Sequence, residues 1–183
     1  MKKIPTVFER DWNGDRSKVV NQVHPRCQWV LDGEGTPTRK IDGTCCMIRG
    51  GKLFKRQEVK EGKPTPPHFE EADFDEETGK RVGWCPVGDG PEDKWHRDGF
   101  DPALPDGTYE LVGPKVQGNV EHEEKHRLVP HTPAALAFHE DVPRTFEGIR
   151  EWMRGKDIEG IVFHHPDGRM AKIKLRDFGI PRN

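Results

Sequence analysis

Short runs in which apolar and polar residues alternate recur along this 183-residue chain, and this pattern predicts mostly β-strands. Gly50-Gly51 and Pro166-Asp167-Gly168 have the residues of tight turns, so each would close a hairpin. Thr145 is a typical N-cap for a single clear helix, which has one apolar face and ends near Gly155. The expected strands span residues 27–31, 44–49, 53–59, 82–87, 108–112, 160–164 and 170–175.

Two lysine patterns stand out within this framework. In an extended segment, side chains two residues apart share a face, so Lys40 and Asp42 would lie together, followed by a glycine at position 43 where the backbone turns or approaches another group closely. The hairpin of residues 44–59 would hold Lys40 against a sheet. Lys172 and Lys174 likewise share a face, and their charges repel unless an anion lies between them. Each pattern is also compatible with an ordinary solvated surface.

The intervening segments are more polar. Residues 60–80 contain prolines and an acidic run from Glu70 to Glu77, which predicts an exposed loop or insertion. Residues 88–106 are irregular, and a loop of this length is often a binding element or lid. The length of the chain favours a single domain over residues 1–183.

Composition narrows the class of protein. The formal net charge of −2 excludes a histone-like positive coat, so nucleic-acid binding would need a local basic patch. No apolar run approaches membrane-spanning length and no signal peptide is evident, which predicts a cytoplasmic protein with no membrane partner. The four cysteines form no Cys-x-x-Cys pair, so we expect reduced, mostly structural thiols. If Cys45 and Cys46 lie on one strand, they point to opposite faces and are unsuited to one ligand set.

Five segments, taken in order, resemble the motifs of the covalent nucleotidyltransferases, which include ATP-dependent ligases and capping enzymes. They are Lys40-Ile41-Asp42-Gly43, Leu53-Phe54-Lys55-Arg56, Tyr109-Glu110-Leu111-Val112-Gly113, Glu159-Gly160-Ile161-Val162-Phe163 and Lys172-Ile173-Lys174. From about Cys27 onward the chain most resembles the small RNA ligases typified by the vertebrate RNA ligase 1 family. Further matching segments are Thr44-Cys45-Cys46, Gly83-Trp84-Cys85-Pro86-Val87, Gly118-Asn119 and Leu128-Val129-Pro130-His131.

The resemblance implies an α+β fold in which antiparallel sheets and flanking helices enclose a nucleotide cleft. Lys40 would be the catalytic nucleophile that carries AMP, with Glu110 contacting the ribose and Glu159 lying near the metal. Phe138 would either stack on adenine or pack in the core. The nucleotide-binding set is Lys40, Asp42, Gly43, Arg56, Glu110, Phe138, Glu159, Lys172 and Lys174, and the metal ligands are Glu110 and Glu159.

The chemistry of these residue types agrees with the implied roles. Only a deprotonated amine attacks phosphorus, and nearby cations would lower the pKa of Lys40 while offsetting charge on the α-phosphate. Carboxylates are the hard ligands that magnesium or manganese prefers. Asp42 would pair elsewhere, because an ion pair with Lys40 would raise the pKa that catalysis needs lowered.

The implied activity is ATP-dependent joining of RNA 5′-phosphate and 3′-hydroxyl ends through a lysyl-AMP intermediate. ATP and the divalent metal would be cofactors, and no obligate protein partner is evident. Little sequence follows Lys174, so no C-terminal OB domain is expected. Lys52, Lys55, Lys60, Arg169 and Arg176 are candidates for an RNA-binding patch.

Alternative functions remain open. A capping-type guanylyltransferase would prefer GTP, and a non-catalytic relative would bind RNA ends without forming an adduct. A third alternative is a zinc metallopeptidase, because His122, Glu123 and His126 fit His-Glu-x-x-His, which needs a helix to bring both histidines to one ion. The few apolar residues around this motif favour a solvated loop instead.

Overall fold

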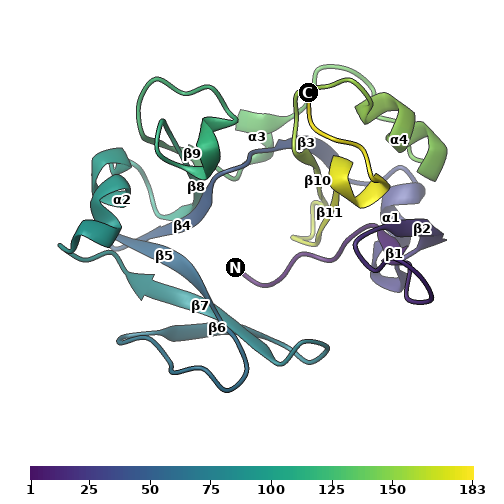
Figure 1. Ribbon diagram of the computed structural model, residues 1–183. Helices are drawn as coiled ribbons and strands as arrows, with labels where there is room; N and C mark the ends of the chain where they lie inside the picture. The colour runs from purple at the N-terminus through teal and green to yellow at the C-terminus, as the bar shows by residue number, and fades with distance from the viewer. The chain divides into compact units, whose positions relative to one another are not determined.

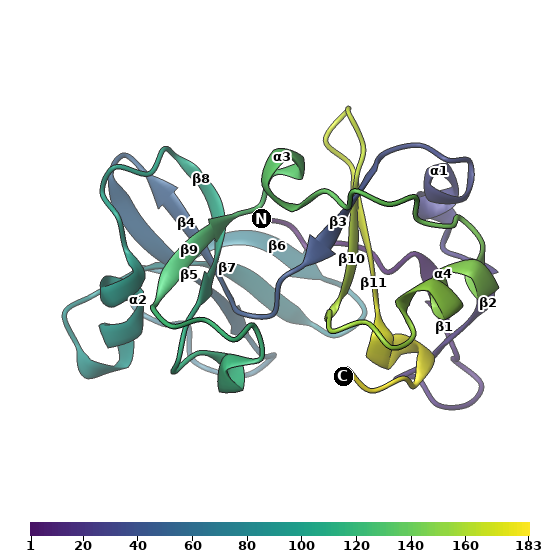
Figure 2. The ribbon, with the colours of Figure 1, turned by 90° about the horizontal axis from the view of Figure 1, so that it is seen from above.

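The computed structural model describes residues 1–183 and is α+β, with antiparallel sheets and few helices (Figures 1 and 2). The chain divides into two compact units. The first unit comprises Met1–Lys3 and Asp42–His131, and the second comprises Ile4–Ile41 and Thr132–Asn183. The boundary falls inside the tetrapeptide at positions 40–43, and a single functional domain over the whole chain stays a prediction. None of the helices has the length and apolar character needed to cross a membrane.

The first unit is built on a six-stranded antiparallel sheet with the order β6-β7-β5-β4-β8-β9. Its helix α2 spans Lys94–Gly99, and short 3-10 turns occupy Pro91–Asp93 and Gln117–Asn119. The strands are β4 (Thr44–Arg49), β5 (Lys52–Val59), β6 (Glu70–Asp75), β7 (Lys80–Pro86), β8 (Gly107–Val112) and β9 (Arg127–Pro130).

One face of this sheet carries the apolar core of the first unit. Alternate residues of β4 and β8 enter it, because successive side chains on a strand point to opposite faces. Its buried members are Cys46, Ile48, Leu53, Tyr109, Leu111, Val116 and Leu128. The predicted β4–β5 hairpin is confirmed, and Gly50 and Gly51 have the positive φ angles of 58° and 72° that its turn requires.

The acidic part of residues 60–80 differs from the sequence prediction of a loop. Residues Glu70–Asp75 form β6, an edge strand that pairs with β7, and a register shift occurs between Glu71 and Asp73. Arg49 forms an ion pair with Glu70, and Lys3 forms one with Asp75. Pairing with β7 and these ion pairs hold the polar segment in a strand, and its charges protect the sheet edge from pairing with other chains. Residues 60–65 are exposed, as predicted.

The second unit contains a three-stranded antiparallel sheet with the order β11-β10-β3 and a two-stranded sheet formed by β1 and β2. The β10–β11 hairpin is the yellow-green pair in Figure 1 and was predicted from the sequence. The strands are β1 (Phe8–Arg10), β2 (Val19–Val23), β3 (Thr36–Lys40), β10 (Gly160–His164) and β11 (Met170–Lys174). The helices are α1 (Gln28–Leu31), α3 (Pro133–Leu136) and α4 (Phe146–Met153), with 3-10 turns at Pro25–Cys27 and Leu175–Phe178.

Helix α4 has the cap that the sequence predicts. The Thr145 side chain accepts a hydrogen bond from the Gly148 amide at 3.1 Å, and Gly155 follows the helix with a φ of 78°. Ile149 and Met153 are fully buried in the core of the second unit, which also receives Ile161 of β10. The apolar face of α4 therefore contributes to the same core as the β11-β10-β3 sheet.

Two sequence predictions were wrong in this unit. Residues 27–31 form a helical turn rather than a strand: Pro25 starts it, and the Gln28 and Asp32 side chains hydrogen-bond at 3.0 Å one helical turn apart. Such a short apolar run does not distinguish the two periodicities. Lys40 was also expected to begin an extended segment supported by the hairpin of residues 44–59. It is instead the last residue of β3, which pairs with β10.

Candidate functional site

The second unit brings together Lys40, Glu159 and Lys174, which the sequence placed in three separate motifs. Lys40 ends β3 and Lys174 ends β11, and both are register partners of Gly160 on the central strand β10. Their side chains lie on the sheet face opposite the buried Ile161 and Ile173. Antiparallel pairing thus places two ammonium groups beside the carboxylate that precedes β10.

Glu159 binds both lysines. The Lys40 Nζ lies 2.7 Å from Oε2 of Glu159, and the Lys174 Nζ lies 2.8 Å from Oε1. The exposed fractions of the three side chains are only 14–20%, so solvent screens these ion pairs weakly. Burial would raise the pKa of the Glu159 carboxyl, but Lys40 and Lys174 outweigh it and hold this pKa below its ordinary value.

Gly160 allows this arrangement because there is no room for a side chain at its position. A Cβ there would lie 2.1 Å from the backbone oxygen of Ile173 and 2.8 Å from the Cα of Lys174. Backbone contacts of this kind cannot be relieved by rotating a side chain. The glycine after Glu159 therefore permits close pairing of β10 with β11, which sets the position of Lys174.

Replacing Gly160 with alanine is expected to destabilise the protein by about 1–3 kcal/mol, because β10 and β11 must separate to admit the methyl group. Urea unfolding of the purified variant measures the effect. Gly88→Ala is the matched control, because the nearest atom to its added Cβ is at 3.6 Å, an ordinary contact. Equal stability of the two variants would contradict the close approach of β10 to β11 at Gly160.

Lys172 and Phe138 lie in the same unit with different surroundings. Lys172 shares the face of Lys174 and pairs with Val162 of β10, while its backbone bonds to Pro5 and Val7. Phe138 packs edge-on against Trp152, with ring centroids 4.9 Å apart, at the margin of the core. This contact favours core packing of Phe138, and its stacking on adenine stays a prediction.

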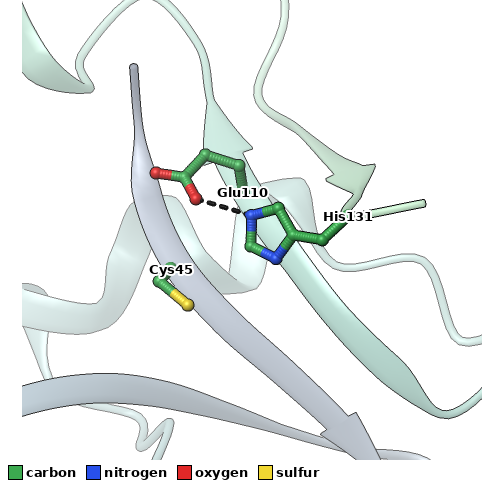
Figure 3. A group of neighbouring side chains, drawn as sticks. All are labelled: Cys45, Glu110 and His131. Carbon is green, nitrogen blue, oxygen red and sulfur yellow. Dashed lines mark hydrogen bonds and ion pairs between the residues drawn. The ribbon is translucent and has the colours of Figure 1, made fainter. Parts of the chain in front are cut away.

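Glu110 and Gly43 form a second set of contacts, in the first unit. The Gly43 amide donates to Oε1 of Glu110 at 3.2 Å, and Oε2 lies 2.8 Å from Nε2 of His131 (Figure 3). A Cβ on Gly43 would lie 2.2 Å from the backbone oxygen of Leu111, so the residue must be glycine for β4 to start beside β8. The Asp42 amide donates to the Glu121 side chain at 2.9 Å. The predicted orientation of the Asp42 carboxylate stays a prediction.

Arg56 lies on β5, opposite Trp84 of β7. Its Nε is buried and makes no hydrogen bond within the chain. A buried guanidinium N–H without a partner is costly unless an acceptor binds it. The buried Nε does not by itself show an anion site, and phosphate binding by Arg56 stays a prediction.

Some residues proposed for an RNA-binding patch are already engaged. Lys55 forms a short ion pair with Asp93, whose exposed side-chain fraction is 3%. Arg169 is bound to Asp167 at 2.8 Å and lies over the Trp29 ring. Both cations are thus at least partly neutralised, so Lys52, Lys60 and Arg176 are the better candidates for RNA contacts.

The structure contradicts a peptidase site at His122, Glu123 and His126. No helix forms there, and His122 has a φ of 57°, so the two histidines are not on one helical face. His126 instead stacks on Trp95 and bonds to Asp98 at 2.7 Å. The expected loop is confirmed at this motif, but it is only partly solvated, because the His126 side chain is 6% exposed.

Sequence reasoning assigned no role to His131, Cys45 or Glu121, all of which lie close to motif residues. Cys45 lies on β4, two residues after Gly43. Because successive side chains on a strand point to opposite faces, Cys45 lies on the polar face and Cys46 does not. The pairing of β4 with β8 that brings it to Glu110 is a long-range contact, which no local pattern specifies.

Comparison with known proteins gives one distant similarity. No protein-family model matches the sequence. The chain is similar to RNA ligase 1 of Pongo abelii, with 27% identity over a match that covers 79% of this chain and 67% of that protein. This similarity suggests a relationship to RNA ligases.

Proposed function

We propose that this protein is an ATP-dependent RNA ligase with a nucleotidyltransferase fold, in which Lys40 forms a covalent bond to AMP. The observation that carries the proposal is the convergence of Lys40, Glu159 and Lys174, three motif residues far apart in sequence, within one sheet. The similarity to RNA ligase 1 of Pongo abelii supports an RNA substrate.

In the proposed reaction, the neutral amine of Lys40 attacks the α-phosphorus of ATP. The new N–P bond replaces the bond to pyrophosphate, which leaves, and the lysine proton passes to solvent. An oxygen of an RNA 5′-phosphate then displaces the lysine, taking up the AMP. Finally a 3′-hydroxyl attacks that 5′-phosphate, AMP leaves, and the two RNA ends are joined.

Glu159 would hold the nucleophile in place before ATP binds. While Lys40 donates to Oε2 as an ammonium, its nitrogen has no lone pair for attack, so the ammonium must first lose a proton. An incoming phosphate offers Lys174 a second anionic partner, and Lys174 is positioned to offset its charge. Loss of the Lys40 ammonium proton to solvent would then provide the lone pair that attacks the α-phosphorus.

The carboxylate of Glu159 is proposed to hold magnesium once one of its oxygens is released from a lysine, because magnesium binds proteins through one or two carboxylates together with substrate phosphates and water. When bound, the metal would stabilise negative charge on the phosphates. Glu110, whose carboxylate pairs with His131, is proposed to contact the nucleotide ribose or a metal, as the motif resemblance implies. Arg56 is proposed to bind a phosphate through its guanidinium group, as the motif resemblance implies.

The proposal is tested by incubating the purified chain with magnesium and ATP or GTP labelled at the α-phosphate. After denaturation, ATP is expected to leave a covalent label on the protein, and addition of 5′-phosphorylated RNA is expected to discharge it and yield joined RNA. Preference for GTP would indicate a capping-type guanylyltransferase. RNA binding without any label would indicate a non-catalytic relative.

A further inference from the structure

Three side chains that commonly bind metals converge on one face of the first unit (Figure 3). Cys45 lies on β4, Glu110 on β8 and His131 directly after β9. The thiol sulfur, a carboxylate oxygen and a ring nitrogen all lie within 4.8 Å of one another; Glu110 is buried, and Cys45 and His131 are half-buried. Side chains from three neighbouring strands thus surround one point.

Strand register explains this convergence. Cys45 and Glu110 are direct partners in the β4–β8 pair, and Glu110 is the partner of Val129 on β9. His131 follows Val129 by two residues, so extended geometry keeps it on the same side. The neighbouring Cys46 points to the apolar core instead. The three candidate ligands therefore occupy the polar face together.

Two outer contacts orient the ligand atoms. The Gly43 amide holds Oε1 of Glu110, which leaves Oε2 directed toward His131. The Thr108 hydroxyl lies 3.1 Å from Nδ1 of His131, which leaves Nε2 directed toward Glu110. In protein metal sites, such second contacts fix the orientation of a histidine and a carboxylate.

We propose that Cys45 Sγ, Glu110 Oε2 and His131 Nε2 bind a divalent ion of the zinc class, with a fourth position open to water or an anion. A thiolate and an imidazole favour zinc over magnesium, which prefers oxygen ligands alone. Three protein ligands and one open position are the usual number for zinc in a reactive site. On binding, the ion displaces the proton between Nε2 and Oε2 and the proton of the thiol.

This site does not rest on the proposed ligase activity, since it is tested with metal alone. The two are nevertheless linked through Glu110, which is also proposed to contact the nucleotide. If both proposals hold, an ion bound at this site withdraws the Glu110 carboxylate from the nucleotide, and zinc inhibits adenylylation that magnesium supports.

The test uses the full chain, freed of metal with a chelator and kept reduced. Titration with Co²⁺, a spectroscopic substitute for zinc, is expected to produce the ultraviolet charge-transfer band of a thiolate–cobalt bond together with tetrahedral visible bands. Both bands should reach saturation at one Co²⁺ per chain, and added Zn²⁺ should abolish them by displacing the cobalt. Absence of the charge-transfer band in the wild-type protein overturns the proposal.

Variants identify the ligands. Cys45→Ser is expected to lose the charge-transfer band, and His131→Ala to weaken zinc binding at least about tenfold in competition with a chromophoric chelator. Cys85→Ala, which removes a thiol of β7 in the same unit, and His122→Ala should match the wild type. Circular dichroism establishes that each variant is folded, and His131→Ala decides the outcome if Cys45→Ser does not fold. A band that survives in folded Cys45→Ser, or unchanged zinc affinity in folded His131→Ala, contradicts the site.

Discussion

Replacing Lys40 with arginine is expected to abolish covalent labelling by ATP, a loss of at least about a thousandfold, while the protein stays folded. Arginine keeps the positive charge and can still pair with Glu159, which Lys40 contacts at 2.7 Å. Its guanidinium is not deprotonated in proteins and cannot become the nucleophile. The measurement is the radioactivity that remains on the protein after denaturation, with the adduct mass as a second readout.

A matched control is available in the same unit. Lys156 forms an ion pair with Glu140 at 3.0 Å, with side-chain exposed fractions of 32% and 57%, outside the cluster around Glu159. Lys156→Arg should therefore label like the wild type. Labelling of Lys40→Arg at the wild-type level would show that another residue carries the nucleotide, and the proposed mechanism would fail.

The same variant separates the first step from the later ones. RNA that already carries AMP on its 5′-phosphate does not need the lysine nucleophile, so Lys40→Arg should still join it to a 3′-hydroxyl end. Joining of this substrate would show that the rest of the site is intact. Failure with both substrates, in a folded variant, would mean that the Lys40 side chain has a further role in end joining.

The sequence predicted those parts of the fold that depend on local chemistry. The turn at Gly50-Gly51 and the cap at Thr145 need no long-range information, and both are confirmed. Residues 27–31 and β6 were predicted wrongly because packing and pairing partners, rather than local propensity, decide their structure. The division of the chain into two compact units has no composition change to mark it.

Local sequence likewise indicated only part of the candidate site. Motif resemblance selected Lys40, Glu159 and Lys174, but the sequence did not specify the pairing with Gly160 that brings them together. Nor did it indicate that Glu159 would bind both lysines, since the resemblance suggested a role near the metal. Antiparallel register connects residues more than a hundred positions apart, and local patterns carry no such information.

Replacing Glu159 with glutamine is expected to lower both the stability of the protein and its labelling by ATP. The amide is nearly the same size but removes the charge that Lys40 and Lys174 share, so two weakly solvated ammonium groups lose their counter-ion. The free energy of unfolding at neutral pH should fall by about 1–3 kcal/mol. Labelling by ATP should also fall, because the variant no longer positions Lys40.

The pH dependence of this loss of stability distinguishes the effect of the Glu159 charge from the effect of its packing. The pKa of Glu159 is lowered in the folded protein from its ordinary value of 4.5, so its contribution to stability is fully present above about pH 4.5 and is lost as the pH falls through the folded value. Urea unfolding of wild type and Glu159→Gln should therefore differ at pH 7 and converge in acid. Glu140→Gln, which removes an exposed partner of Lys156, should cost at most about 1 kcal/mol at pH 7. A difference between wild type and Glu159→Gln that persists unchanged in acid would mean that the shape of the side chain, and not its charge, stabilises the cluster.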